Sequence, residues 1–531
     1  MTNNLNSPAP KGDIILLLRK WLGIVLYLSI VGEMIFFPSW SNLAGCAMEL
    51  IVWLIFRTFF FKKKIILEHP FSFLTFLSMF LARYLPLPAT LIEGKPITYG
   101  FEVPFQTFYW ETLMFFICSL AFYASIKTKT KRNNLVQRTL QNLRFFDTDA
   151  TTLWLLGLIG LVVRIQQLSV AENVQFGDVN NKFLAGLVYL QYAPIIMLFP
   201  SLSGVSFNKR RNLFVWLYTG LIFIASFATN SRQSMIYPIF TIMLLFFLYL
   251  LKDNISIFRI LSPTKILIIL VVVFFGLNLL SDISIAMLAN RSIRSNISRA
   301  ELFDKTIETL QNDEMMTRLR NASLEKRSEV GAYYNGWDET YLDNFMLNRY
   351  GNMRVSDQTI YYAEKIGFEN SEMQDSFVDK VLAIYPLPIL SFLGIKLDKN
   401  KLLYSPGDML YRIGGGSNAL GGYRVTSLIA DGLATFGYFC FPILFALLFM
   451  SFKLLDCLVY YSKNGIVYST LGLISVFDFL GMFRNSISCS VPVSFVLREF
   501  WQLCITFWII VSLIQLIPFK KRRAILLRKI N

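Results

Sequence analysis

The sequence predicts an all-α polytopic membrane protein with about twelve transmembrane helices and one large, partly helical loop late in the chain. Of its 531 residues, 54% are hydrophobic and only 16% are charged, which is too apolar a composition for a soluble domain of this length. Long apolar runs alternate with short polar joints. Because the lipid core accepts backbone only as helix or closed barrel, these runs indicate membrane-spanning helices.

The apolar runs divide the chain into three regions. Residues 1–281 form an N-terminal transmembrane bundle of about nine helices, residues 282–424 form a polar loop region, and residues 425–531 hold about three further helices. Each run is about long enough to cross the bilayer core. The predicted spans lie near residues 21–37, 43–61, 71–92, 110–126, 151–168, 183–202, 213–229, 235–251, 266–287, 425–451, 466–483 and 500–518.

Basic residues fall on alternate joints, which predicts the orientation in the membrane. The basic joints include Lys62 to Lys64, the run from Lys127 to Arg144, and Lys520 to Arg523. By the positive-inside rule these joints and both termini are cytoplasmic, and the loop 282–424 lies on the opposite, outer side of the membrane. Within this loop Val381 to Lys396 is apolar but short and rich in proline, so we expect an interfacial or re-entrant segment there.

Several function classes are excluded by composition. The formal net charge is +16, but the cations lie in short joints beside apolar runs, which argues against nucleic-acid binding. The six cysteines are scattered and predict neither a metal site nor a disulfide framework. The single histidine, His69, is expected at the surface of a cytoplasmic joint, so chemistry on the outer face cannot use an imidazole. No metal and no cofactor are expected.

Arginines occur where the positive-inside rule disfavours cations, in the outer halves of helices and in outer joints. A guanidinium presents a planar fork that binds phosphate or diphosphate through paired hydrogen bonds, so these residues predict a lipid diphosphate ligand. The alternative for each of them is snorkelling, or a structural ion pair with an acid such as Glu33, Glu111, Asp282 or Asp478. The set is Arg83, Arg164, Arg232, Arg291, Arg294, Arg484 and Arg498.

A glycine-rich segment with turns at Ser405–Gly407, Gly414–Gly416 and Gly421–Gly422 precedes the tenth predicted helix. Arg412 lies between the first two turns, and Arg424 follows the last. Glycine permits tight turns and lets a ligand approach backbone amides, which suits sugar hydroxyls or phosphate oxygens; a flexible loop is the alternative. One outer carboxylate could remove a proton from an attacking sugar hydroxyl, and spacing does not select which. The candidates are Asp338, Glu339, Asp343, Asp357, Asp408 and Asp431.

Two stretches resemble the Wzy-type O-antigen and capsule repeat-unit polymerases. The turn Ala228–Ser234, with Arg232 inside it, resembles their small-Ser-Arg turn, and Gly414–Gly422 followed by Ala430–Tyr438 is similar to the segment after their large periplasmic loop. The resemblance implies a metal-independent glycosyltransferase that uses undecaprenyl-diphosphate-linked oligosaccharides. O-antigen ligases are expected to use a periplasmic histidine, and the position of His69 therefore favours a polymerase.

The sequence-based hypothesis is a polymerase of lipid-linked repeat units. Arg232 would lead the diphosphate site, with Arg83, Arg164, Arg291, Arg294 and Arg484 around it and with Arg412 and Arg424 in the loop. Asp408 or Asp431 would activate the acceptor hydroxyl. The expected partners are membrane lipid and a chain-length regulator protein, with no nucleic acid. The alternatives are a lipid-linked oligosaccharide flippase and a transferase that uses another lipid-linked sugar.

Overall fold

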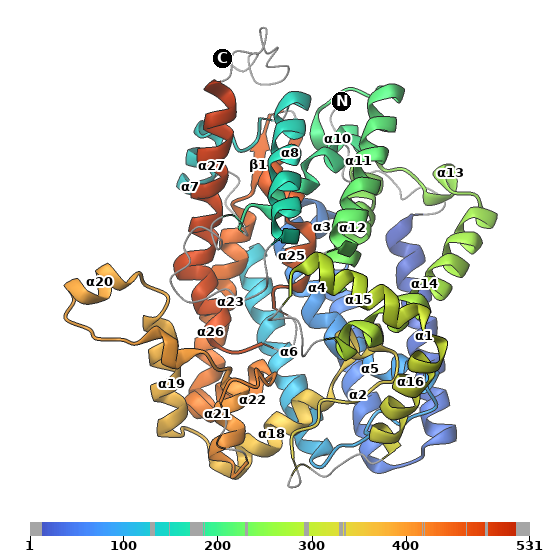
Figure 1. The fold of residues 1–531 in the computed structure, drawn as a ribbon, viewed down its shortest axis with the longest axis vertical. Helices are drawn as coiled ribbons and strands as arrows, with labels where there is room; N and C mark the ends of the chain where they lie inside the picture. The colour runs from blue at the N-terminus through green and yellow to red at the C-terminus, as the bar shows by residue number, and fades with distance from the viewer. Residues whose placement is uncertain are drawn as a thin grey trace.

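The computed structural model describes residues 13–127, 133–147, 149–169, 184, 186–228, 232–290, 297–328, 333, 336–416, 418, 420–463, 465–483 and 487–516. This part of the chain is mostly helical, and a single two-stranded hairpin is the only sheet in it. The long helices run side by side along the vertical axis of Figure 1. The all-α fold class is therefore confirmed.

Six helical segments of the described chain are long and apolar enough to cross a membrane. They are α1 (Ile14–Phe36), α2 with η1 (Trp40–Ile55 and Phe56–Phe60), α6 (Pro104–Lys127), α12 (Arg232–Asp253), α22 to α23 (Leu428–Phe436, η7 Gly437–Phe439, Cys440–Asp456) and α26 to α27 (Ser490–Ser494, η8 Phe495–Glu499, Phe500–Leu516). A seventh is the bent pair α4 (Pro70–Tyr84) and α5 (Pro86–Ile92), which meet at 44°. The predicted count of about twelve spanning helices is therefore not confirmed by helix length and hydropathy in the described residues.

The remaining predicted spans in the N-terminal region are helical as well. The segment 151–168 is α8 (Ala150–Gln166), which ends in η2 (Gln167–Ser169), and 183–202 holds η3 (Val188–Leu198) and α10 (Pro200–Ser203). The segments 213–229 and 266–287 lie in α11 (Lys209–Ala228) and α14 (Pro263–Ala289). The short helices α3 (Lys63–Glu68), α7 (Leu135–Asn142) and α13 (Ile257–Ile260) connect them.

The predicted span 466–483 is not one helix. Its start is strand β2 (Gly465–Tyr468), which pairs antiparallel with β1 (Val459–Ser462), and only the short helices α24 (Thr470–Ile474) and α25 (Val476–Gly481) follow. The strands are rich in valine, isoleucine and tyrosine, which favour a pleated surface. Gly465 takes a φ of 122° at the turn, a conformation that a residue with a side chain rarely adopts. The preference of these residues for β structure has therefore outweighed the length of the apolar run, which had predicted a spanning helix.

Residues 282–424 form a partly helical region, as predicted. After the end of α14 it contains α15 (Arg299–Gln311), α16 (Asp313–Ser328), α17 (Phe345–Gly351), α18 (Arg354–Ile366), α19 (Ser371–Leu382), α20 (Leu387–Phe392), η6 (Lys399–Leu402) and α21 (Pro406–Ile413). It packs on the joint before α6: the buried carboxylate of Asp357 accepts hydrogen bonds from Glu102 N at 2.8 Å, Thr107 Oγ1 at 2.8 Å and Tyr333 Oη at 2.8 Å.

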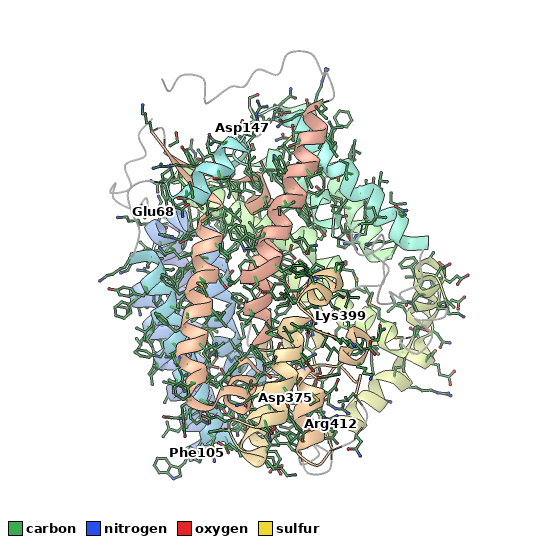
Figure 2. The ribbon with its side chains drawn as sticks, turned by 90° about the vertical axis from the view of Figure 1, so that its left-hand side faces the viewer. Glu68, Phe105, Asp147, Asp375, Lys399 and Arg412 are labelled. Carbon is green, nitrogen blue, oxygen red and sulfur yellow. The ribbon has the colours of Figure 1, made fainter. Side chains whose placement is uncertain are left out.

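The bundle has two distinct ends. Helices α18, α21 and α22 lie at the lower end in Figure 1, which we call the loop end, and α7 and strand β1 lie in the upper part, toward the hairpin end. Figure 2 shows Phe105 and Arg412 near the loop end and Asp147 near the hairpin end. His69, expected at the surface, is buried, and its Nδ1 lies 2.6 Å from Asp456 Oδ2 because α4 packs against α23.

The core of the bundle is largely aromatic. The rings of Phe56 and Phe80 stack at 3.9 Å between η1 and α4, and Phe76 and Phe122 stack at 4.7 Å between α4 and α6. Each of these four side chains is almost fully buried. Offset stacking adds about 0.5–1.5 kcal/mol per pair beyond burial, so these helices form a firm scaffold.

Candidate functional site

A cluster of polar side chains lies inside the bundle where α8, η3, α12 and α25 meet. We call Arg164, Gln191, Tyr192, Tyr237 and Asp478 the polar layer. In Figure 1, α8, α12 and α25 lie in the upper half of the bundle, whereas α6 and α23 extend further toward the loop end. Polar groups at this depth in a membrane bundle are costly, and they usually mark a ligand path or a functional site.

Asp478 is the acid of the polar layer. It lies on α25, which contacts α4 and α12, and the Tyr237 hydroxyl donates a hydrogen bond to its Oδ2. Although neighbouring helices surround it, the residue keeps accessible surface. Asp478 therefore borders a recess enclosed by the bundle, because a carboxylate packed against protein on all sides would have no accessible surface.

The basic and amide members of the layer lie next to that acid. The rings of Tyr192 and Tyr237 stack at 4.1 Å with an interplanar angle of 6°, and Arg164, which is 7% exposed, lies beside the Tyr192 hydroxyl. Gln191 is fully buried and near the same hydroxyl, yet neither its amide oxygen nor its amide nitrogen has a hydrogen bond of normal geometry within the described residues. Buried polar atoms are normally satisfied, so this amide is suited to a ligand or water.

Two glycines of α8 bring η3 into this position. A Cβ added at Gly157 would lie 2.4 Å from Pro194 Cγ, and one added at Gly160 would lie 2.1 Å from the backbone nitrogen of Gln191. Tyr218 Oη on α11 closes the contact by donating to Gly157 O at 2.7 Å and Gln191 O at 3.0 Å. Small residues permit such close backbone approach in membrane helices. The close approach of η3 to α8 places Gln191 and Tyr192 beside Arg164.

The loop-end side of the polar layer is flanked by α15. This helix contacts η2 and α11, and Leu310 at its end packs with Met235, Ile283 and Met287 from α12 and α14. Arg232 begins α12 beside this small cluster, and its side chain is outside the described part of the structure. Three further predicted ligands, Arg291, Arg294 and Arg484, also lie outside the described residues.

Asp408, a predicted base, is instead a structural acceptor in the loop. It is fully buried, caps α21 with Ser405, and accepts hydrogen bonds from Tyr423 N at 2.9 Å and from Arg424 Nη1 at 2.8 Å. Burial raises the pKa of Asp408, but the backbone and guanidinium hydrogen bonds outweigh burial and hold that pKa below its ordinary value. A carboxylate held in its ionised form by several donors is a poor proton acceptor, so the geometry favours a structural role.

The two loop arginines lie at the loop end. Arg424 pairs with Asp408, and its guanidinium carbon lies 4.5 Å from the centre of the Tyr411 ring. Arg412 is paired with Glu372 at 3.0 Å and, with Ile413 and Asn418, lines an open cavity of about 450 Å³. These polar groups could contact a sugar chain, but they are not assembled with the polar layer.

Asp431, the second predicted base, fixes the start of α22. It is 3% exposed and accepts a hydrogen bond from Cys489 N at 2.7 Å, so it ties α22 to the segment that precedes α26. Lys380 of α19 lies near both Asp431 and Asp408, and burial lowers the pKa of Lys380. The structure thus brings the two predicted acids near one lysine, within the packed base of the loop.

Arg83 is held in a buried ion pair. Its Nη2 lies 2.7 Å from Glu111 Oε2, its Nε donates to Glu111 O at 3.1 Å, and both side chains are almost fully buried. The Phe115 ring, 5.8 Å from the guanidinium carbon, packs over the pair. A structural ion pair is the alternative stated for these arginines in the sequence analysis. The pair with Glu111 occupies the guanidinium of Arg83, which was predicted to bind a diphosphate.

Asp478, Tyr237 and Gln191 were not predicted as site residues. From the sequence, Asp478 is expected only as an ion-pair partner of an arginine, and the structure pairs it with a tyrosine hydroxyl. The available signal was a single carboxylate inside an apolar run, which in a membrane segment indicates function by default. Tyr237 and Gln191 lie within apolar runs and give no comparable signal.

Within the described residues, no group of three or more histidine, cysteine, aspartate or glutamate side chains could hold a metal ion. No family model matches the chain, and no curated protein or solved structure is significantly similar to it. The polar layer, with its acid at an enclosed recess and its buried guanidinium, is therefore the candidate functional site on geometry alone.

Proposed function

We propose that the protein is a bacterial inner-membrane glycosyltransferase that joins undecaprenyl-diphosphate-linked oligosaccharide units into O-antigen or capsule-type polysaccharide on the periplasmic face. The observation that carries the proposal is the polar layer, where a carboxylate at an enclosed recess is linked through two stacked tyrosines to a buried guanidinium inside an apolar bundle. A lipid diphosphate has its charged headgroup beside an apolar tail, and such a site suits both parts.

The proposed reaction transfers the growing chain from its lipid diphosphate to a hydroxyl of the next lipid-linked unit. A new carbon–oxygen bond forms at the anomeric carbon as the bond from that carbon to the diphosphate oxygen breaks, and the diphosphate leaves with the electron pair. The hydroxyl proton passes to a general base. Asp478 fits this role better than Asp408 or Asp431, because it borders open space while they are closed in by donors.

Arginines would stabilise the departing diphosphate. Arg164 lies beside the hydroxyl of Tyr192, whose ring stacks on that of Tyr237, the hydrogen-bond donor to Asp478. Arg232 begins α12 five residues before Tyr237. Fixed positive charge in a partly dry site lowers the energy of the charge that develops on a leaving group. We assign diphosphate binding to Arg164 and Arg232, and sugar contacts to the loop cavity beside Arg412.

The test is electrophoresis of surface polysaccharide from a strain in which the gene is deleted and then complemented. Asp478→Asn keeps the size of the side chain and removes the base, so the complemented strain should show a core with single repeat units and no ladder. Asp375→Asn, an exposed acid at the loop end, is the matched control and should restore the full ladder. A normal ladder from Asp478→Asn would reject the base, and lipid-linked units trapped on the cytoplasmic side would indicate a flippase.

A further inference from the structure

An apolar arm projects sideways from the loop region. It runs from Tyr385 to Ile395 and contains α20, and most of its side chains face solvent: Phe392 is 90% exposed, Leu393 61%, Leu387 51% and Ile389 46%. Leu390, at 1%, is the buried exception. The arm thus buries Leu390 and presents a largely apolar outward face.

The arm is held in this shape by hydrogen bonds at its base. Lys399 Nζ donates to Ala383 O at 2.8 Å and to Tyr385 O at 2.5 Å, which ties the returning chain to the outgoing one. At its far end Ile395 N donates to Leu390 O at 2.8 Å, and Gly394 takes a φ of 73°, which closes the last turn of α20. An apolar loop that is tied in this way presents its side chains at a defined place.

That place is beside the spanning helices. In Figure 1, α20 stands to the left of α23 and α26, near the middle of the long axis, and the view in Figure 2 places Lys399 at a similar height, in front of the long helices. The neighbouring span Ser490–Leu516 also exposes apolar side chains, among them Ile505 at 56% and Ile509 at 44%. The apolar face of the arm therefore continues the lipid-facing band of the bundle.

The charges near the arm agree with this placement. Lys396 and Lys401 are exposed just after the arm, where long cationic side chains can reach lipid phosphates while the apolar residues enter the acyl region. A contiguous exposed apolar surface of this kind on a soluble face would be an aggregation hazard, which a lipid environment removes.

We infer that Tyr385–Ile395 is a membrane anchor that inserts into the bilayer leaflet nearest the loop region, with acyl chains covering Phe392, Leu393 and Leu387. Interfacial segments of this type bury their apolar side chains about 5–10 Å into the boundary between headgroups and acyl chains. The anchor would fix the position of α19 and α21 above the membrane surface. This inference stands whether or not the proposed glycosyl transfer is correct.

The test is depth-dependent fluorescence quenching of the full-length protein in lipid vesicles. The six native cysteines are buried, so a cysteine introduced as Phe392→Cys can be labelled selectively with an environment-sensitive dye. Asp375→Cys, on α19, is the matched control, and Leu387→Cys is a second arm position if the first variant fails to fold. Lipids with a spin label high on the acyl chain should reduce the arm label's emission roughly twofold or more, because a group at this depth lies beside the quencher.

The control label should be quenched by aqueous iodide and not by the lipid. Equal iodide quenching of the arm and control labels would overturn the inference. The inference would also be overturned if, in detergent, the arm label were protected from iodide only in samples that contain a dimer. That result would show that a second copy of the chain covers the arm.

Discussion

Replacing Gly160 by alanine should displace η3 and disable the polar layer. The added Cβ would lie 2.1 Å from the backbone nitrogen of Gln191, which falls 1.3 Å short of the 3.4 Å at which ordinary contact begins, and the obstacle is backbone. Overpacking of this kind costs about 1–3 kcal/mol. A shift of about 1 Å in η3 also moves Gln191 and Tyr192 away from Arg164, and a misplacement of that size can reduce a rate by about 100-fold.

The matched control is Gly220→Ala on α11, where an added Cβ meets nothing within 4 Å. Alanine there should leave stability unchanged or raise it by up to about 1 kcal/mol, because alanine favours helix more than glycine. The assays are the melting temperature of each purified variant in detergent and the polysaccharide ladder of each complemented strain. Equal melting temperatures and equal ladders for the two variants would refute the packing argument.

Two further changes probe the structural roles assigned to predicted site residues. Arg83→Ala should lower the free energy of unfolding by about 3–5 kcal/mol, since it leaves Glu111 buried and unpaired. The double variant Arg83→Met with Glu111→Leu should recover most of that loss in thermal melts. If Arg83→Ala were instead stable and produced no polysaccharide ladder, Arg83 would belong to the diphosphate site. The lowered pKa of Asp408 means that its contribution is complete above pH about 4 and is lost as the pH falls below that value. Proteolysis of residues 405–424 should therefore increase on acidification in the wild type, and Asp408→Asn should be cleaved readily at every pH; identical cleavage of both proteins throughout would contradict the structural role.

Much of the fold follows from the apolar pattern, because a bilayer accepts few backbone conformations. Six helices and one bent pair lie at predicted spans, and the loop region is partly helical as expected. The pattern could not show that 465–468 is a strand or that η3 is a short tight helix around Pro194, because both segments are as apolar as a spanning helix.

The site was less predictable than the fold. Residue type indicated that outer arginines bind anions, but only packing shows that Arg83 is neutralised by Glu111 while Arg164 lies beside a tyrosine hydroxyl. The carboxylates raised the same difficulty. Asp408 and Asp478 are both aspartates, so residue type does not distinguish them. Asp408 is surrounded by hydrogen-bond donors and Asp478 borders a recess, and this difference depends on contacts between residues that are distant along the chain.

The most direct test of the account is an electron cryomicroscopy structure of the protein with undecaprenyl diphosphate in lipid nanodiscs. We predict diphosphate density in the recess beside Asp478, with its oxygens about 3 Å from the guanidinium of Arg164 or Arg232. Density for the diphosphate elsewhere in the bundle, or a recess beside Asp478 that side chains fill completely, would contradict it.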